Sequence, residues 1–139
     1  MLPEALRSQL LQAAAEAARN AYAPYSGYRV GAALLTHQGR IFGGCNVENA
    51  SYGLTVCAER AAVLAAVTGE GPQMKIRALA VVSDGKAPLA PCGACRQVLL
   101  EFGKDAAVIF QGPEGLTVAR VGELLPLRFQ LPEDKRGGD

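Results

Sequence analysis

The chain has 139 residues, a formal net charge of +1 and 50% hydrophobic residues, a composition typical of globular proteins. Its 14 Lys and Arg residues and 13 Asp and Glu residues are mixed along the sequence, whereas nucleic-acid-binding proteins usually carry a basic face. No signal-peptide pattern and no run approaching the ~18 apolar residues of a membrane span is found. We therefore expect a soluble cytoplasmic protein that binds neither nucleic acid nor a membrane.

Apolar spacing and turn residues predict the secondary structure in chain order. The first half is expected to contain a helix over 3–21, a hairpin of strands over 28–36 and 40–44, an irregular loop over 44–55, and a helix over 57–71 that closes at Gly69. The second half is expected to contain a buried strand over 77–84, a helix over 92–103, strands over 106–110 and 116–119, and a helical turn over 121–126.

These elements predict one α/β domain over residues 1–139, with a looser C-terminal tail over about 129–139. Because strands alternate with helices, we expect three α/β/α layers around a mixed, mostly parallel five-stranded sheet with an antiparallel N-terminal hairpin. Ligands of such sheets bind where strands run through loops into helix N-termini, so the loops before the second and third helices are the candidate site.

Three of the four cysteines lie at those loops. Cys92 and Cys95 form a C-x-x-C pair in "PCGACRQ", and both Cys57 and Cys92 open a predicted helix. Without a secretion signal, metal or redox use is favoured over disulfides. A helix N-terminus favours the thiolate over the thiol, so three sulfurs could hold one zinc ion if the two helices point at one place.

The fourth zinc position separates a structural site from a catalytic one. Cys45 could close a structural Cys₄ site, whereas a position open to water would permit chemistry. A thioredoxin-like redox role is a third interpretation, although it requires neither Cys57 nor Glu59. His37 lies in the predicted hairpin turn and is expected to be exposed rather than a ligand.

Charged residues next to the cysteines favour the catalytic interpretation. Glu59, two residues after Cys57, is placed as a general acid–base would be, although a glutamate in a first turn can simply favour the helix dipole. Arg60 and Arg96 follow ligands closely and could donate hydrogen bonds to the sulfurs, which would temper the excess negative charge of three thiolates. The alternative for both arginines is a surface ion pair.

The motif "CAE", followed about one helix and one strand later by "PCGACRQ", resembles the small homotetrameric cytidine deaminases that use three cysteines to bind zinc. The segments "YAPYSGYRVGAALLT", "GCNVENASYG" and "ELLP" are also similar to that family, so the resemblance covers nearly the whole chain. It implies the deaminase fold, one Zn²⁺ per chain held by Cys57, Cys92 and Cys95, and a homotetramer whose sites are shared between subunits.

The resemblance also implies roles for single residues. Glu59 would be the catalytic proton shuttle, and Arg60 would temper the thiolates. Asn46 and Glu48 would bind the ribose hydroxyls, with loop capping as the alternative role for both. The backbone of Ala58 would approach the carbonyl region of the base.

Three further positions follow from the same comparison. Tyr28 stands where family members usually have Phe and would contact the nucleoside with an additional hydroxyl. Phe129 resembles an aromatic residue that reaches a neighbouring subunit's site, with local core packing as the alternative. Cys45 occupies a position where the family has a strand-end residue rather than a ligand, which favours an open fourth position on zinc.

The expected reaction is hydrolytic deamination of cytidine and deoxycytidine to uridine and deoxyuridine, with release of ammonia, in pyrimidine salvage. Glu48 would repel a phosphate and no Gly-rich phosphate loop is present, so a free nucleoside is favoured over a nucleotide. The alternatives are a blasticidin-type or RNA-editing deaminase on a related scaffold, and a non-catalytic Cys₄ zinc module that binds a partner. Ammonia release from cytidine separates these alternatives from the main interpretation.

Overall fold

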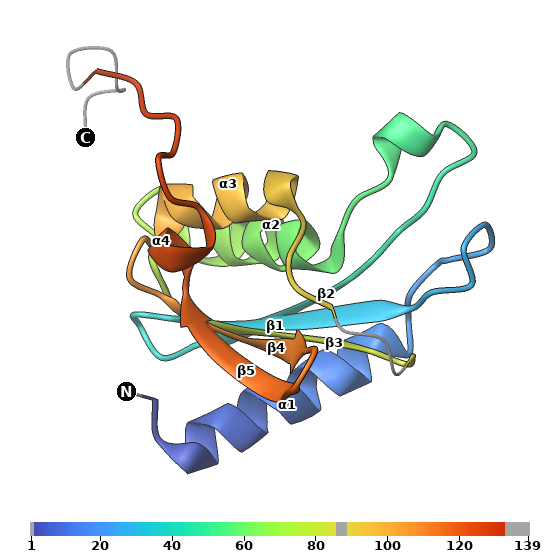
Figure 1. The fold of residues 1–139 in the computed structure, drawn as a ribbon, viewed down its shortest axis with the longest axis horizontal. Coiled ribbons are helices and arrows are strands. Elements are labelled where there is room, and N and C mark those ends of the chain that lie inside the picture. Colours follow the sequence, from blue (N-terminus) through green and yellow to red (C-terminus); the bar gives the residue numbers. More distant parts are fainter. Residues whose placement is uncertain (1, 86–88, 133–139) are drawn as a thin grey trace.

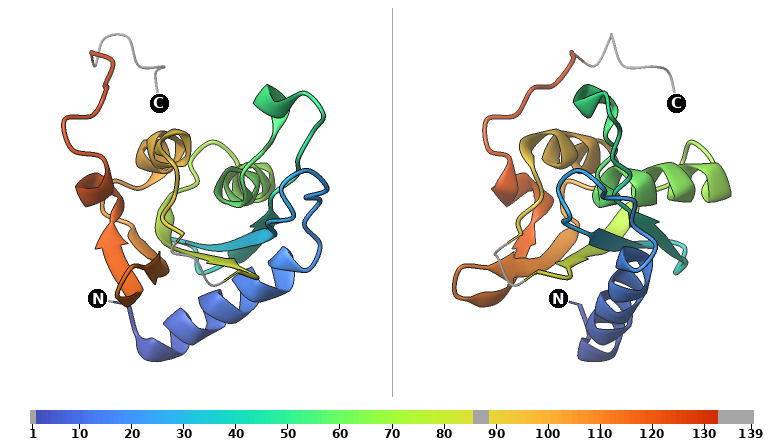
Figure 2. Two further views of the ribbon diagram at one scale, coloured as in Figure 1. Left: turned by 45° about the vertical axis from the view of Figure 1, so that its right-hand side comes forward. Right: turned by 90° about the vertical axis from the view of Figure 1, so that its right-hand side faces the viewer.

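The computed structural model of the protein describes residues 2–85 and 89–132 and shows three layers (Figure 1). Helix α1 (Glu4–Ala18) covers one face of the sheet, and helices α2 (Ala58–Glu70) and α3 (Gly93–Phe102) cover the other face (Figure 2). A single helical turn, α4 (Val121–Leu124), lies next to α3, and the loop before α2 contains a short 3-10 helix, η1 (Tyr52–Leu54). The three-layer α/β/α prediction is confirmed.

The sheet is mixed and five-stranded, as expected, with the order β2-β1-β3-β4-β5. Its strands are β1 (Val30–Thr36), β2 (Ile41–Cys45), β3 (Ile76–Ser83), β4 (Ala107–Gly112) and β5 (Gly115–Arg120). The expectation that it is mostly parallel is wrong, because only β3 and β4 pair in parallel and the other neighbouring pairs are antiparallel. A parallel pair needs a crossover connection, and α3 is the one helix that connects two adjacent strands of the described sheet.

Helix α2 runs past the glycine that was expected to end it. Gly69 lies inside the helix, and Gly71 follows its last residue with φ 92°. The Gly71 N–H donates to the carbonyl of Val67, so this glycine satisfies a terminal carbonyl in a conformation that residues with a Cβ rarely adopt. Helix α1 also ends earlier than predicted, at Ala18.

Two apolar layers hold the helices to the sheet. One layer lies under α1 and the other lies under α2 and α3. At Gly44, strand β2 touches the backbone of α2 directly: a Cβ there would lie 2.4 Å from the Ala62 nitrogen and 2.6 Å from the Ala58 oxygen. This contact fixes the first turns of α2 relative to the sheet, and with them the residue that precedes the helix, Cys57.

Gly44→Ala should therefore destabilise the protein by about 1–3 kcal/mol, because the added methyl meets backbone atoms that cannot rotate away. Gly43→Ala is the matched control, since a Cβ at Gly43 would make only an ordinary 3.6 Å contact with the Ala17 Cβ. Urea unfolding of both variants measures the difference. Equal free energies of unfolding for the two variants would show that β2 and α2 are not packed this closely.

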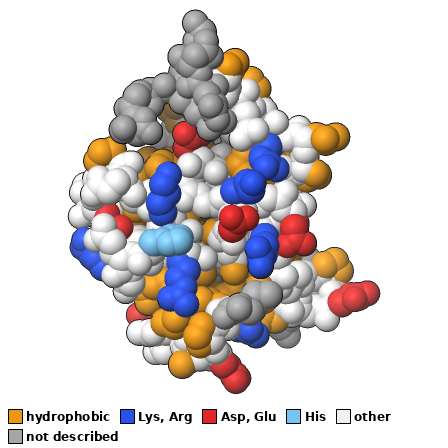
Figure 3. Space-filling view, turned by 90° about the vertical axis from the view of Figure 1, so that its left-hand side faces the viewer, with side chains coloured by type: hydrophobic (Ala, Val, Ile, Leu, Met, Phe, Trp, Pro, Cys, Tyr) orange, Lys and Arg blue, Asp and Glu red, His pale blue; other side chains and the backbone are white. Residues whose placement is uncertain are grey.

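After α4 the chain runs away from the sheet along the side of α3 (Figure 2). Residues 128–132 form no helix or strand, and the rest of the expected C-terminal tail, from residue 133, lies outside the described residues. No helix in the described ranges is both long and apolar enough to cross a membrane. On the face seen in Figure 3, the acidic and basic side chains of the described residues are interspersed.

Candidate metal centre and substrate site

Three cysteine sulfurs meet where α2 and α3 begin. Cys57 immediately precedes α2, Cys92 immediately precedes α3, and Cys95 lies buried in the first turn of α3. The Sγ atoms of Cys57 and Cys92 lie 4.0 Å apart, those of Cys92 and Cys95 lie 3.4 Å apart, and all three lie within 4.8 Å of one another. Sulfurs on one tetrahedral zinc, at about 2.3 Å from the ion, are separated by about 3.8 Å. The donor set therefore fits one zinc ion per chain, as predicted.

The surroundings of the sulfurs favour a thiolate at Cys57 and a thiol at Cys95. A hydrogen bond from the Cys95 thiol, with a further contribution from the Arg60 guanidinium, lowers the pKa of Cys57 to about 5. The same hydrogen bond, together with burial, raises the pKa of Cys95. The backbone N–H of Cys95 also donates to the Cys92 Sγ over 3.5 Å, as expected at a helix N-terminus. A bound cation would displace the proton of the Cys95 thiol, because cysteine binds a metal as the thiolate.

The two arginines next to the cysteines lie differently. The Nη2 of Arg60 donates both to the Cys57 Sγ, over 3.5 Å, and to the Thr55 carbonyl, over 3.2 Å. Arg60 therefore reaches a ligand sulfur. Arg96 instead donates to the carbonyls of Pro91 over 2.8 Å and of Leu124 over 2.9 Å. The hypothesis that Arg96 hydrogen-bonds the sulfurs is wrong, because its guanidinium connects the start of α3 to α4.

Glu59 lies in the first turn of α2 and is only 5% exposed. Burial raises the pKa of its carboxyl, and the negative charge of Cys57 raises it further. The carboxylate is not part of the three-sulfur group that could hold a metal. Glu59 is therefore a buried acid beside the metal centre that can hold a proton closer to neutral pH than an exposed glutamate can.

Asn46 is 8% exposed and organises the backbone that leads into β1. Its Oδ1 accepts from the Val30 N–H over 2.8 Å, and its Nδ2 donates to the Tyr28 carbonyl over 2.8 Å. These two bonds leave one N–H of the side-chain amide for another partner.

Glu48 organises the loop that precedes Tyr28. Its Oε1 accepts from the backbone N–H groups of Tyr25, over 2.9 Å, and Ser26, over 3.1 Å, and its Oε2 accepts from the Ser26 hydroxyl. The Ser26 hydroxyl is also the main cause that lowers the pKa of Glu48. The capping role that was the alternative for Asn46 and Glu48 is thus present. Sequence reasoning missed Ser26, although a serine before a glycine is typical of a turn.

The remaining substrate candidates lie at different depths. Ala58 is fully buried as the first residue of α2, where helix N–H groups have no partner within the helix. Tyr28 is half-buried: its hydroxyl accepts from the Ser83 Oγ over 3.4 Å, and its ring packs against Gly85. Phe129 is 71% exposed, so local core packing is not its role.

Two expected non-ligands lie away from the three sulfurs. Cys45, at the end of β2, is not part of the cysteine group, so the described residues form no Cys₄ site. His37 is exposed in the turn between β1 and β2.

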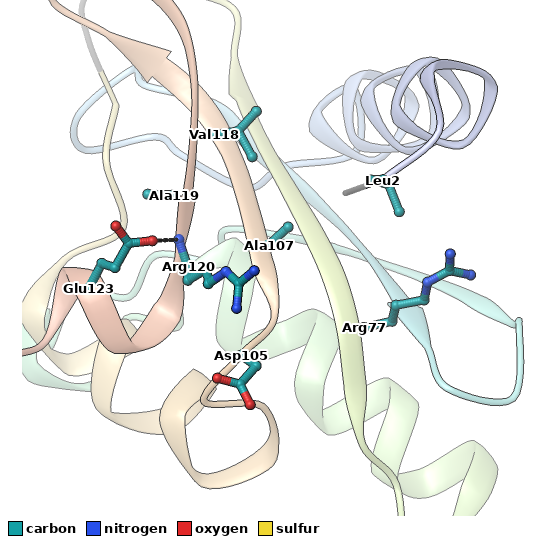
Figure 4. A pocket seen from close by; sticks show the side chains of 8 residues that line it. All are labelled: Leu2, Arg77, Asp105, Ala107, Val118, Ala119, Arg120 and Glu123. Atoms are coloured by element: carbon teal, nitrogen blue, oxygen red, sulfur yellow. Dashed lines mark hydrogen bonds between the residues drawn. The ribbon is translucent and has the colours of Figure 1, made fainter.

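Two hollows of the described part of the chain lie away from the cysteines. A hollow of about 290 Å³ is lined by Arg77, Asp105, Arg120 and Glu123 beside the apolar Leu2, and its charges balance (Figure 4). Another hollow, of about 420 Å³, lies at the end of β3. Its lining residues are Val81, Val82, Ser83, Gly85, Leu89, Gln111 and Leu116. The cysteines line neither hollow, and Cys92 is exposed, so solvent reaches one of the three ligands in the single chain.

Residues 5–111 match the family model described as the cytidine and deoxycytidylate deaminase zinc-binding region. A curated cytidine deaminase from Halalkalibacterium halodurans is 47% identical over 125 residues, covering 88% of this chain and 93% of that protein. A cytidine deaminase from Mycobacterium tuberculosis is 45% identical over 139 residues, covering 97% and 100%.

Solved structures agree with these relatives. The cytidine deaminase from Burkholderia pseudomallei superposes with a TM-score of 0.80 at 48% identity, covering 88% of this chain and 98% of that chain. The crystal structure of the Mycobacterium tuberculosis enzyme gives 0.79 at 46% identity, covering 90% and 98%. With its fold, its three-cysteine centre and these matches, the chain belongs to the cytidine and deoxycytidylate deaminase family of zinc-dependent hydrolases.

Proposed function

We propose that this chain catalyses the hydrolytic deamination of cytidine and deoxycytidine to uridine and deoxyuridine, with release of ammonia, in pyrimidine salvage in the cytoplasm. The observation that carries the proposal is the buried Glu59 beside three sulfurs that fit one zinc ion. The curated relatives named cytidine deaminase support the same substrate.

Zinc held by the three sulfurs would supply a water activated for attack on carbon at neutral pH. Glu59 would provide the proton transfers. It would take one proton from the attacking water and give it to N3 of the ring, which makes C4 electrophilic. It would then take the proton of the new hydroxyl on C4 and give it to the amine, which leaves as ammonia. Its raised pKa suits this work, because a general acid–base is most efficient when its pKa is near the working pH. Arg60, which donates to the Cys57 sulfur, would draw off part of the thiolate charge.

Asn46 and Glu48 would hold the sugar with the hydrogen-bonding capacity that the loop leaves free. Asn46 and Glu48 are two residues apart in an extended segment that pairs with Tyr22 and Val56, so their side chains share a face. The Asn46 amide retains one N–H donor and one acceptor site on its oxygen. The Glu48 carboxylate, with three of about four acceptor sites used, retains one acceptor site.

The free N–H of Asn46 and the free acceptor site of Glu48 match a single hydroxyl group, which both accepts and donates. Ribose and deoxyribose share the 3′-hydroxyl, so we propose that the enzyme accepts both sugars. The negative charge of Glu48 would disfavour a phosphate nearby. Tyr28 and the free N–H of Ala58 would contact the base.

Glu59→Gln should remove nearly all deamination while leaving the zinc content and the melting temperature close to those of the parent. The amide preserves the shape but cannot exchange protons, and general acid–base groups contribute ~10²–10⁴-fold in rate. Ammonia release from cytidine and from deoxycytidine is measured together with zinc by plasma emission. A zinc-loaded variant that retains more than a tenth of the parent's turnover would contradict the role of Glu59.

We also propose that the enzyme is a homotetramer whose sites are completed by neighbouring subunits. One ligand of the metal centre, Cys92, is exposed in the single chain, and several large apolar side chains are exposed on loops and on the C-terminal segment, as expected of surfaces that another subunit covers. These side chains include Tyr25, Tyr52, Leu127 and Phe129.

Sedimentation should therefore give the mass of four chains, and Phe129→Ala should raise KM for cytidine because an aromatic contact from the neighbouring subunit is lost. Leu131→Ala, which removes another exposed apolar side chain from the same segment, is the control and should leave KM unchanged. A monomer with full activity would contradict shared sites. A Phe129→Ala enzyme with the parent's KM would remove Phe129 from the substrate site.

A further inference from the structure

Ser26 donates two hydrogen bonds to the Glu48 carboxylate, more than any other described residue does. We propose that Ser26 is a positioning residue, which orients the Glu48 carboxylate toward the sugar of the substrate. The inference rests on the proposed function, because it requires that Glu48 bind the sugar.

The backbone N–H and the side-chain hydroxyl of Ser26 each bind one oxygen of the Glu48 carboxylate. The backbone N–H donates to Oε1 over 3.1 Å, and the side-chain hydroxyl donates to Oε2. The terminal torsion of a glutamate has a broad energy profile, so one hydrogen-bonded oxygen leaves the carboxylate plane free to turn. Two bonds from one residue to the two oxygens fix this plane, and with it the direction of the one free acceptor site.

The hydroxyl of Ser26 is itself oriented by a third bond. The Tyr28 N–H donates to the Ser26 Oγ over 2.9 Å, which leaves the hydroxyl hydrogen to point at Glu48. The chain of bonds therefore runs from Tyr28 through Ser26 to Glu48 and connects the proposed base contact to the proposed sugar contact. Hydrogen bonds that end on a charged acceptor are stronger than neutral ones, and the lowered pKa of Glu48 agrees with such a bond.

The backbone around Glu48 does not depend on the Ser26 hydroxyl. The Glu48 N–H donates to the Tyr22 carbonyl over 2.8 Å, and Val47 exchanges backbone hydrogen bonds with Val56 over 2.9 and 3.0 Å. Removal of the hydroxyl should thus loosen the carboxylate without unfolding the loop. The consequence is specific: only substrates that offer a sugar hydroxyl to Glu48 should be affected.

Steady-state kinetics with cytidine and 2′,3′-dideoxycytidine test this on the zinc-loaded enzyme. Ser26→Ala should raise KM for cytidine roughly tenfold, as expected for a weakened bond to a charged group, with little change in kcat. It should leave KM for dideoxycytidine unchanged, because this substrate lacks the hydroxyl that Glu48 would bind. Ser26→Thr, which retains the hydroxyl at an exposed position, should restore the parent's KM. Ser8→Ala, on the exposed face of α1, is the control.

A double variant distinguishes action through Glu48 from a general effect. In a Glu48→Gln background, Ser26→Ala should add no further increase in KM, because residues that act as a unit are not additive. An equal loss on both substrates, an additive loss in the double variant, or a parent-like KM for cytidine in Ser26→Ala would each overturn the inference. In these cases the parent still deaminates cytidine, so the proposed function survives. A zinc-loaded parent that releases no ammonia from cytidine overturns the proposed function and the inference together.

Discussion

The site depends on the convergence of two helix N-termini at one point. Helix α2 reaches this point because β2 contacts its backbone at Gly44, where no side chain could fit. Helix α3 reaches it because it connects the two parallel strands, β3 and β4, and crosses the same face of the sheet. Each helix brings a cysteine at its N-terminus, where free N–H groups favour thiolates. Backbone packing thus brings the two helix starts together, and the cysteines at these starts form the metal centre.

The loop next to the proposed sugar site is held in place by hydrogen bonds rather than by backbone packing. Residues 22–28 form no regular element apart from one bridge at Tyr22, and none of them belongs to the two apolar layers. Hydrogen bonds between the side chains of Asn46 and Glu48 and the backbone of residues 22–28 give this loop a defined shape. A loop that is ordered by the same groups that would bind the sugar has its free donor and acceptor already in place, which lowers the entropy lost on binding. Packing positions the metal centre, and polar bonds position the proposed sugar site.

The sequence allowed the prediction of features that depend on local spacing. The three cysteines and Glu59 lie within short motifs at helix starts, so their positions follow once the helices form. Arg96 and Ser26 could not be assigned, because their partners are distant in sequence: Arg96 bonds Leu124, and Ser26 bonds Glu48. The preponderance of antiparallel pairs was missed for a similar reason. Helix α2 connects β2 to β3, which are not neighbours, and the order of elements along the chain does not reveal that β1 lies between them.

The central claim is that three sulfurs hold zinc and that its fourth position is not a cysteine. X-ray absorption at the zinc edge, on protein purified without added metal, measures the ligand set directly. The account predicts three sulfur neighbours at about 2.3 Å and one lighter neighbour, oxygen or nitrogen, with the same spectrum for Cys45→Ala. Four sulfur neighbours, with one of them lost in Cys45→Ala, would show a closed structural site and would contradict the account.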